Sequence, residues 1–229
     1  MNTRAHCRRI RWVWAICVGL LAFQISRSSR AESFEDSLLV YAVNIQMQSW
    51  TGFGIYLGKG LFITAAHVVG HAWMTKPKVV IAGQEYPTSV VKEGSFEGTD
   101  LTLLSVDESL LPMRLRLRHN KLCKEPPWPG EQVVTVVPEG VVSSHVIAPE
   151  RLPIGVRRFS TAIADVAHTG NSGSGVFDAQ HRCLLGIMSR KISQSRTQPY
   201  SGKTETRDIA KYFVPASEIA AFLPTGLAP

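Results

Sequence analysis

Three residues spread along the chain have the side-chain types needed for acyl transfer. His67 ends the strand-like run 60–67, Asp100 opens an apolar run, and Ser172 lies in the glycine-rich turn 170–173. A serine hydroxyl becomes a good nucleophile when a neighbouring imidazole takes its proton. A carboxylate beside the imidazole fixes its tautomer and stabilises the imidazolium that forms. Together the three residues indicate hydrolysis through a covalent acyl-serine.

Glycines flank the serine on both sides, at Gly170 and Gly173. They allow the backbone to fold tightly, so that N–H groups point at one spot. There the N–H groups can stabilise the charge that develops on the substrate oxygen, and each donor contributes roughly 10²–10³ in rate. The turn around the serine thus supplies the second requirement of acyl transfer.

Each of the three segments alone has a simpler interpretation. A lone histidine is usually a surface or core residue, a Gly-Asn-Ser-Gly sequence also forms hairpin turns, and an aspartate before a strand is often a turn cap. The catalytic interpretation therefore depends on all three occurring together, in an exported chain of β type.

The elements that must position these residues read as short strands. Apolar or alternating runs recur between Gly, Pro, Asn and Asp residues, which predicts an all-β sandwich or barrel. The runs are 39–45, 54–57, 61–64, 79–81, 101–106, 113–117, 132–137, 141–147, 175–177 and 184–188. Helical periodicity appears mainly at the end of the chain, where a short helix is expected over 218–223 and Ser217 could be its N-cap.

Two polar stretches divide the chain. The segment 119–129 is rich in Lys, Pro and Trp and separates an N-terminal half, about 38–118, from a C-terminal half, about 130–215. The segment 191–208 is predicted to be a long exposed loop that could shape the rim of a cleft.

The first 31 residues have the features of a signal peptide. Arginines precede an apolar run over 12–23, which is short for a membrane span but suits a signal-peptide core. Ser29 and Ala31 offer small residues for cleavage, so residues 32–229 form the expected mature chain. Arg27 and Arg30 are unusual so near a cleavage site, and an uncleaved anchor remains the alternative. Either way the body is expected outside the cytoplasm: periplasmic, secreted or membrane-anchored.

The positive charge of the chain belongs mainly to this leader. Six of the 25 Lys and Arg residues lie in it, which leaves 19 basic against 18 acidic residues in the rest. A body so nearly neutral has no electrostatic reason to bind nucleic acid. We therefore expect no nucleic-acid partner, and membrane contact only through an uncleaved leader.

Two cysteines remain outside the leader, Cys123 and Cys183. An oxidising compartment permits one disulfide between them, although the sequence does not show that they meet. Two cysteines without paired ligand spacing give no support for a zinc site, and no metal or other cofactor is expected.

Beyond the three catalytic segments, several stretches resemble the chymotrypsin-like serine peptidases, especially the bacterial Deg-type proteases and glutamyl endopeptidases. The order His67, Asp100, Ser172 is that of the family, with spacings of 33 and 72 residues. Further similar segments are 51–56 before the histidine, 82–87 between His and Asp, and 212–216 at the closing strand. The resemblance spans about residues 38–223.

This resemblance implies two six-stranded antiparallel β-barrels with a short C-terminal helix and the site between the halves. His67 and Asp100 come from the first barrel and Ser172 from the second, while Gly170 and Ser172 supply the oxyanion N–H groups. The activity implied is that of a serine endopeptidase acting on proteins or peptides, with substrate paired to the strand that contains Ser189. Because the sequence ends at Pro229, the PDZ domains of Deg-type relatives are not expected.

The resemblance also suggests a specificity pocket, lined by Val166, Ala167 and Met188. These residues offer no charge to a cationic or anionic side chain, so cleavage after small or medium apolar residues is expected. Asp165 is the competing residue, because a shift of one position would bring its carboxylate into the pocket.

A second class of function fits the same features. A homologue without activity could bind extended peptides and not cleave them, but such proteins usually lack a triad residue, and all three are present here.

Overall fold

The computed structural model describes residues 34–164 and 171–226. The chain divides into two units, Met1–Phe34 and Glu35–Pro229, and all described strands lie in the second. The expected signal peptide, 1–31, lies outside the described residues. Within the described ranges, no helix is long and apolar enough to cross a membrane.

The first half of the second unit is a seven-stranded antiparallel sheet with the order β5-β4-β1-β2-β3-β7-β6. Its strands are β1 (Ala42–Gln46), β2 (Thr51–Gly58), β3 (Leu61–Thr64), β4 (Lys78–Ile81), β5 (Gln84–Tyr86), β6 (Ser89–Glu93) and β7 (Thr102–Ser105). The sheet curls around a core in which Tyr56 packs against Phe62, with 5.0 Å between ring centroids.

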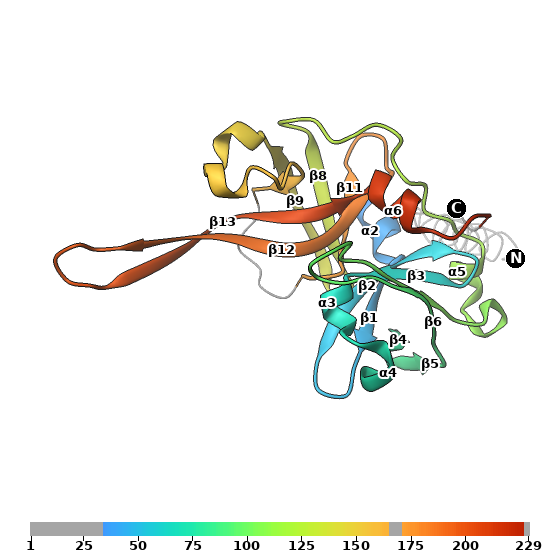
Figure 1. The fold of residues 1–229 in the computed structure, drawn as a ribbon. Coiled ribbons are helices and arrows are strands. Elements are labelled where there is room, and N and C mark those ends of the chain that lie inside the picture. The colour runs from blue at the N-terminus through green and yellow to red at the C-terminus, as the bar shows by residue number, and fades with distance from the viewer. Residues whose placement is uncertain (1–33, 165–170, 227–229) are drawn as a thin grey trace, which may run out of the picture. The chain divides into compact units, whose positions relative to one another are not determined.

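The second half closes into a barrel with the order β10-β13-β12-β11-β8-β9 (Figure 1). Its strands are β8 (Gln132–Val137), β9 (Gly140–Ile147), β10 (Ala162–Ile163), β11 (Gly175–Asp178), β12 (Leu184–Thr197) and β13 (Thr204–Pro215). Val133, Val176 and Phe213 meet in its core. The predicted all-β class is confirmed, although the first sheet has one strand more than expected and does not close by strand pairing.

Short helices connect the strands. They are α2 (Phe34–Leu39), α3 (Ala66–Val69), α4 (Ala72–Thr75), α5 (Met113–Arg116) and the C-terminal α6 (Ala216–Phe222), with 3₁₀ turns η1 (Glu108–Leu110), η2 (Pro149–Arg151) and η3 (Ile154–Val156). The expected terminal helix is present, but it begins at Ala216 and has no side-chain cap, so Ser217 is not its N-cap.

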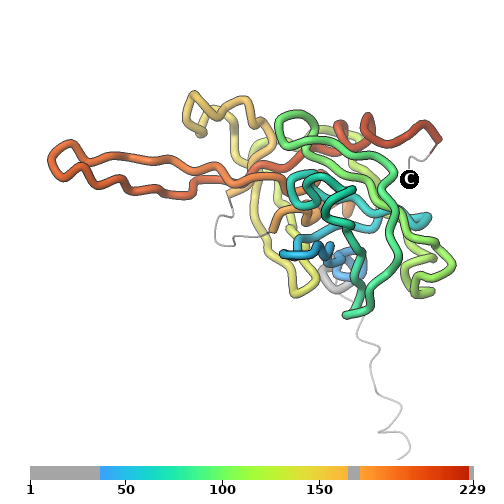
Figure 2. The backbone as a smooth tube through the Cα atoms, turned by 60° about the horizontal axis from the view of Figure 1, so that its bottom comes forward, coloured from blue at the N-terminus to red at the C-terminus, as the bar shows by residue number. Residues whose placement is uncertain are grey.

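Two segments differ from the sequence prediction. The run 113–117 is helical at α5, where the carbonyl of Pro112 accepts hydrogen bonds from Leu115 and Arg116, and Leu115 is its buried residue. The segment 191–208 is the outer part of one long hairpin of β12 and β13, which projects away from the barrel (Figures 1 and 2). We call residues 193–207 the arm.

A disulfide joins Cys123 to Cys183, which are 60 residues apart in sequence, with 5.1 Å between their Cα atoms. It attaches the connector between the halves to the turn before β12, and the backbone N–H of Cys123 also donates to the carbonyl of Leu184. The pairing that the sequence left open is therefore present.

Candidate active site

Strand pairing in the first sheet brings His67 and Asp100 together. Thr64 at the end of β3 lies opposite Thr102 at the start of β7. The residues after Thr64 and those before Thr102 consequently emerge at the same end of the sheet. His67 Nδ1 lies 2.8 Å from Asp100 Oδ2, and the backbone N–H of His67 donates to Asp100 Oδ1 over 2.9 Å.

Asp100 is buried, with 1% of its side chain exposed, whereas 29% of the His67 side chain is exposed. Burial by itself raises the pKa of Asp100. Hydrogen bonds from the His67 ring, the Ser189 hydroxyl and the His67 backbone outweigh it and hold the pKa below its usual value. Asp100 is thus held as an anion, and its carboxylate oxygens can only accept the hydrogen bond from Nδ1 of His67.

The turn that carries Ser172 depends on Gly173. Its φ is +88°, and a Cβ there would lie 1.9 Å from the carbonyl oxygen of Phe53. The backbone N–H of Gly173 donates to the carbonyl of Met188, and the N–H of Phe53 donates to the carbonyl of Ser172. The serine is therefore fixed between β2 of the first half and β12 of the second.

The hydroxyl of Ser172 donates to the backbone carbonyl of Ser189, over 3.3 Å. Among the described residues it makes no hydrogen bond to His67. The structure thus places Ser172 beside the strand that was expected to pair with substrate. The Ser189 carbonyl that accepts from its hydroxyl is also an acceptor that a substrate N–H could use.

Ser189 has a second contact, which the sequence did not predict. The pairing of β12 with β13 shifts register between Met188 and Arg190, so Ser189 is the extra residue of a β-bulge. Bulges redirect side chains. Here the Ser189 hydroxyl donates to Asp100 Oδ2, across 89 residues of sequence. Neither the bulge nor this pairing has a local signal in the sequence.

Phe96 and Arg190 close the other side of the His67–Asp100 pair, and sequence reasoning missed both. The Phe96 ring meets the His67 ring edge-on at 5.4 Å. The Arg190 guanidinium lies 4.0 Å from the centre of the Phe96 ring and donates to the Phe96 carbonyl over 2.8 Å. Arg190 comes from the second half and Phe96 from the first, so this stack also joins the two.

Behind this stack lies a cavity of about 510 Å³ that reaches Asp100. Its wall includes Arg158, Phe159, Tyr212 and Glu218. Burial, together with the negative charge of Glu218, raises the pKa of Tyr212 to about 12, so its hydroxyl stays neutral. The cavity combines aromatic surface with charges of both signs next to the site.

The remaining predicted site residues are placed only in part. Gly170, Val166 and Ala167, and the competing Asp165, lie outside the described residues. Met188 is 2% exposed and its side chain packs in the core of the second barrel. The role of these residues in an oxyanion hole or a specificity pocket stays a prediction.

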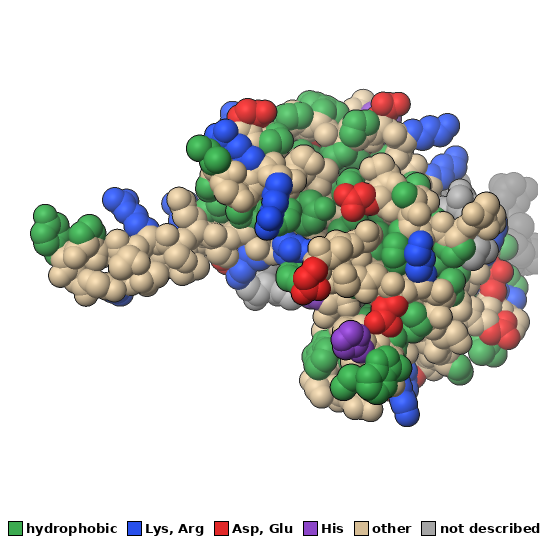
Figure 3. All heavy atoms as spheres, viewed as in Figure 1, with side chains coloured by type: hydrophobic (Ala, Val, Ile, Leu, Met, Phe, Trp, Pro, Cys, Tyr) green, Lys and Arg blue, Asp and Glu red, His purple; other side chains and the backbone are tan. Residues whose placement is uncertain are grey.

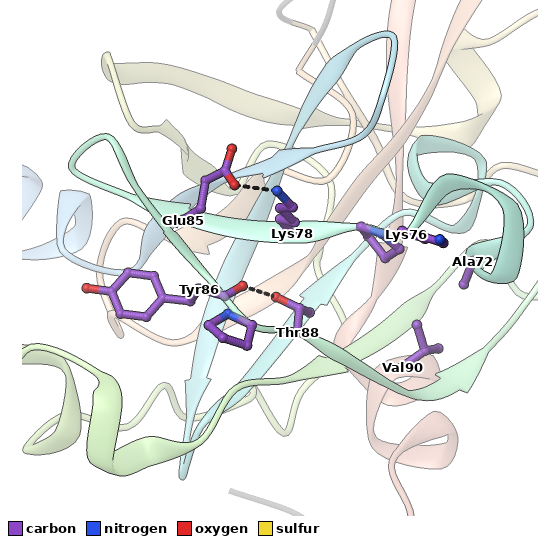
Figure 4. Close-up of a pocket in the computed structure, with 9 residues that line it drawn as sticks. Ala72, Lys76, Lys78, Glu85, Tyr86, Thr88 and Val90 are labelled. Carbon is purple, nitrogen blue, oxygen red and sulfur yellow. Dashed lines mark hydrogen bonds and ion pairs between the residues drawn. The ribbon is translucent and has the colours of Figure 1, made fainter.

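A separate pocket of about 580 Å³ lies against β4, β5 and α4 of the first sheet (Figure 4). Some of its polar groups pair with one another: Lys78 pairs with Glu85, and the Thr88 hydroxyl donates to the Tyr86 carbonyl over 2.8 Å. None of His67, Asp100 and Ser172 lines it. In the described ranges, no group of His, Cys, Asp and Glu side chains is arranged to hold a metal ion.

A histidine and an aspartate from one curled sheet, joined to a serine turn from a closed barrel, define the class of chymotrypsin-like serine endopeptidases. The profile of the trypsin-like peptidase domain matches residues 51–187, more than half of the sequence, and the chain belongs to this family.

Solved structures of low sequence identity share the fold. The Rv3671c protease of M. tuberculosis matches in its inactive form, with a TM-score of 0.58 and 18% identity over 82% of this chain and 89% of that one. Its active form matches with a TM-score of 0.54 and 19% identity over 84% and 83%. The MamO protease domain from Magnetospirillum magneticum matches with a TM-score of 0.51 and 21% identity, over 82% of this chain and 98% of that one. No curated protein matches by sequence.

Proposed function

We propose that this chain hydrolyses peptide bonds with Ser172 as nucleophile, His67 as general base and acid, and Asp100 as the carboxylate that orients His67. The observation that carries the proposal is the 2.8 Å contact of His67 Nδ1 with the buried Asp100, which leaves Nε2 free for proton transfer.

In this mechanism Ser172 Oγ attacks the substrate carbonyl carbon while its proton passes to His67 Nε2. The imidazolium then gives that proton to the departing amine, and an acyl-serine remains. A water molecule, deprotonated by the same nitrogen, attacks the acyl group; the carboxylate product leaves and the proton returns to Ser172. The N–H groups of Gly170 and Ser172 are the proposed donors to the oxyanion.

For specificity we propose cleavage after small or medium apolar residues, on the uncharged character of Val166, Ala167 and Met188 in the sequence. Peptide-library profiling with mass spectrometry tests it. Dominant cleavage after Lys or Arg contradicts it and points to Asp165 in the pocket.

We further propose that the enzyme works outside the cytoplasm. The Cys123–Cys183 disulfide supports this, because such bonds persist in oxidising compartments. The leader supplies the export signal or an anchor, and the nearly neutral body argues against a nucleic-acid partner. Fractionation of cells that express the full chain, with detection of its amino terminus, distinguishes cleavage from anchoring.

One observation favours a silent peptide-binding homologue as the second candidate. The Ser172 hydroxyl is bonded to the carbonyl of Ser189 and not to His67. Fluorophosphonate labelling decides between the two, because the reagent reacts only with an activated serine.

The labelling experiment uses the body 32–229 and the Ser172→Ala variant. We expect an adduct on Ser172, and a loss of proteolysis on the order of 10⁶-fold in kcat in the variant, with the fold retained. An unlabelled body that binds peptides and leaves them intact establishes the silent homologue. Equal cleavage by the variant shows that another residue is the nucleophile.

A further inference from the structure

Strand β12 continues far beyond the active site with one edge open. Strand β11 pairs with β12 only as far as Ile187. From Arg190 to Thr197, β13 is the partner of β12 among the described strands. Over this stretch the opposite edge of β12 therefore has no partner among the described strands, and we call it the open edge. The hairpin carries it away from the barrel (Figure 1).

The open edge begins at the nucleophile. Ser189 immediately precedes the first residue of the open edge, Arg190. The carbonyl of Ser189 accepts the hydrogen bond from the Ser172 hydroxyl. A peptide that pairs antiparallel to β12 with its reacting carbonyl at Ser172 must run its amino-terminal part toward Thr197. Substrate binding and the open edge thus share one strand and one direction.

The inner end of the hairpin is held by buried packing and an ion pair, which fix the direction of the open edge relative to the barrel. Ile192 and Ala210 are buried in a cluster with Leu152, and Lys191 pairs with Asp208 over 2.8 Å. Further out, the cross-strand hydroxyls of Ser195 and Thr206 lie 2.9 Å apart.

The arm can contact a partner through its backbone N–H and C=O groups, because it has no apolar face. All of residues 193–207 are exposed, and most are Ser, Thr, Gln or charged. The space-filling view shows its surface largely as uncharged polar side chains and backbone (Figure 3). A two-stranded hairpin alone is marginally stable in water, and a third strand on its edge would stabilise it. Main-chain pairing of that kind tolerates many partner sequences.

We propose that the edge of β12 from Arg190 to Thr197 binds the part of the substrate that precedes the cleaved bond, out to about the ninth residue. At roughly 3.3 Å per residue, this edge matches some 25 Å of extended chain. Folded proteins rarely present such a length of unpaired backbone. The substrates are therefore unfolded or loosely ordered polypeptides. This inference rests on the proposed function, whose site lies at the start of the edge.

The first test is a length series of quenched peptides that share one cleavable sequence and carry four, six, eight or ten residues before the cleaved bond. Each added backbone hydrogen bond contributes a factor of about 2–10. We expect kcat/KM to rise about tenfold or more from four to ten residues, and a further peptide with twelve residues before the cleaved bond should show no additional gain. Residues added after the cleaved bond serve as the length-matched control.

The second test shortens the arm by replacing residues 194–207 with Asn-Gly, a sequence suited to a tight hairpin turn between Ser193 and Asp208. The buried Ile192 and Ala210 are kept. The ten-residue peptide is expected to fall to the kcat/KM of the four-residue peptide. A length dependence that survives shortening, or is absent from the intact enzyme, overturns the proposal.

Proline substitutions provide a matched comparison that leaves the arm in place. Ser195 and Thr206 are direct partners, so their N–H groups point both inward or both outward. Ser195→Pro and Thr206→Pro therefore disturb the hairpin alike, and if these N–H groups point outward, only Ser195→Pro removes a donor from the open edge of β12. Arg196→Pro and Glu205→Pro cover the other orientation. In the pair with outward N–H groups, we expect only the β12 variant to weaken binding of the long peptide. Equal effects in both pairs overturn the proposal.

Binding is also measured with Ser172→Ala, so that the two proposals fail separately. If the chain cleaves nothing but the dissociation constant still falls about tenfold with peptide length, the edge is established without the enzyme. If Ser172 is labelled and peptides are cleaved without length dependence, the proposed peptidase activity is supported and substrate binding along the open edge is rejected. An arm that alters only self-association also counts against the proposal.

Discussion

The two halves of the protein hold their catalytic candidates in different ways. The first half supplies His67 and Asp100 already paired through a ring contact and a backbone contact to the same carboxylate. The second half supplies Ser172 on a fixed turn, but its hydroxyl is directed to the carbonyl of Ser189. In the proposed mechanism the base, His67, is thus already paired before substrate arrives, whereas the proposed nucleophile, Ser172, uses the carbonyl of Ser189 that would also accept from the substrate backbone.

Two contacts link these halves beside the site. Ser189 on β12 donates to Asp100, and Arg190 stacks on Phe96. Both come from the strand proposed to bind substrate. The difference between the halves therefore suggests that substrate pairing on β12 completes an arrangement that the first half has already prepared.

The strongest test of the prepared half is Asp100→Asn. Asparagine keeps the shape but favours the wrong tautomer of His67, so kcat is expected to fall about 10⁴-fold. Steady-state kinetics with a quenched peptide measures the change, and circular dichroism checks the fold. Asp107→Asn is the matched control: Asp107 also accepts hydrogen bonds in a turn, from Ser109, but it does not contact His67. A comparable loss in both variants contradicts a special role for Asp100.

The disulfide tests whether rigidity of the second half matters separately from chemistry. Replacing Cys123 and Cys183 with serine is expected to lower the free energy of unfolding by about 2–4 kcal/mol, because a closed loop of this length limits the unfolded chain. Urea unfolding measures the loss.

In the folded double variant, kcat/KM should remain within about twofold of the parent value when it is normalised to the concentration of active sites, counted as Ser172 that reacts with the fluorophosphonate. A large loss of activity per labelled site would show that the disulfide positions the serine turn, and that the halves are less independent than described.

Ser189→Ala tests the first link between the halves. The hydrogen bond to a buried anion contributes about 1.5–3 kcal/mol, and only part of it acts on the transition state, so a loss of about tenfold in kcat is expected. Ser193→Ala is the control on the same strand, since the Ser193 hydroxyl donates to Asp208 on the exposed hairpin. Both variants are assayed with the four-residue peptide, which is too short to reach Ser193.

The pH profile of Ser189→Ala separates this role from general damage. The Ser189 hydroxyl helps to lower the pKa of Asp100, so its removal raises that pKa. The carboxylate and the stability it contributes are present at higher pH and lost as pH falls through the folded pKa, and this loss should begin at a higher pH in the variant. An unchanged acid limb would indicate that Ser189 acts only through packing.

The sequence predicted the His67–Asp100 pair because the segments that contain His67, Asp100 and Ser172 occur together and in the order of the family, although each segment alone has a simpler interpretation. Strands with a buried face were also found: the ranges of β3 and β8 match the predicted runs. The arm was missed because both of its faces are exposed, so residues 193–207 lack the apolar alternation that marks a strand. The reverse error occurred at α5, where alternating Arg and Leu imitates a strand. The Ser189 contact depends on a bulge and a partner 89 residues away, which no local pattern encodes.

The smallest expected effect concerns Arg190, the second link. Its guanidinium stacks on Phe96, which in turn meets the His67 ring, and it bonds the Phe96 carbonyl. A partly exposed cation–π contact contributes about 0.5–1 kcal/mol, so Arg190→Ala should reduce kcat about two- to fivefold.

Arg190→Lys keeps the charge but loses the planar stack and the forked donor. If Arg190 positions Phe96 and His67, lysine restores little and the change lies in kcat. If its charge instead attracts the substrate, lysine restores activity, and the change lies in KM and shrinks with added salt. The second outcome would make Arg190 a binding residue of the open edge and leave Ser189 as the link that prepares the site.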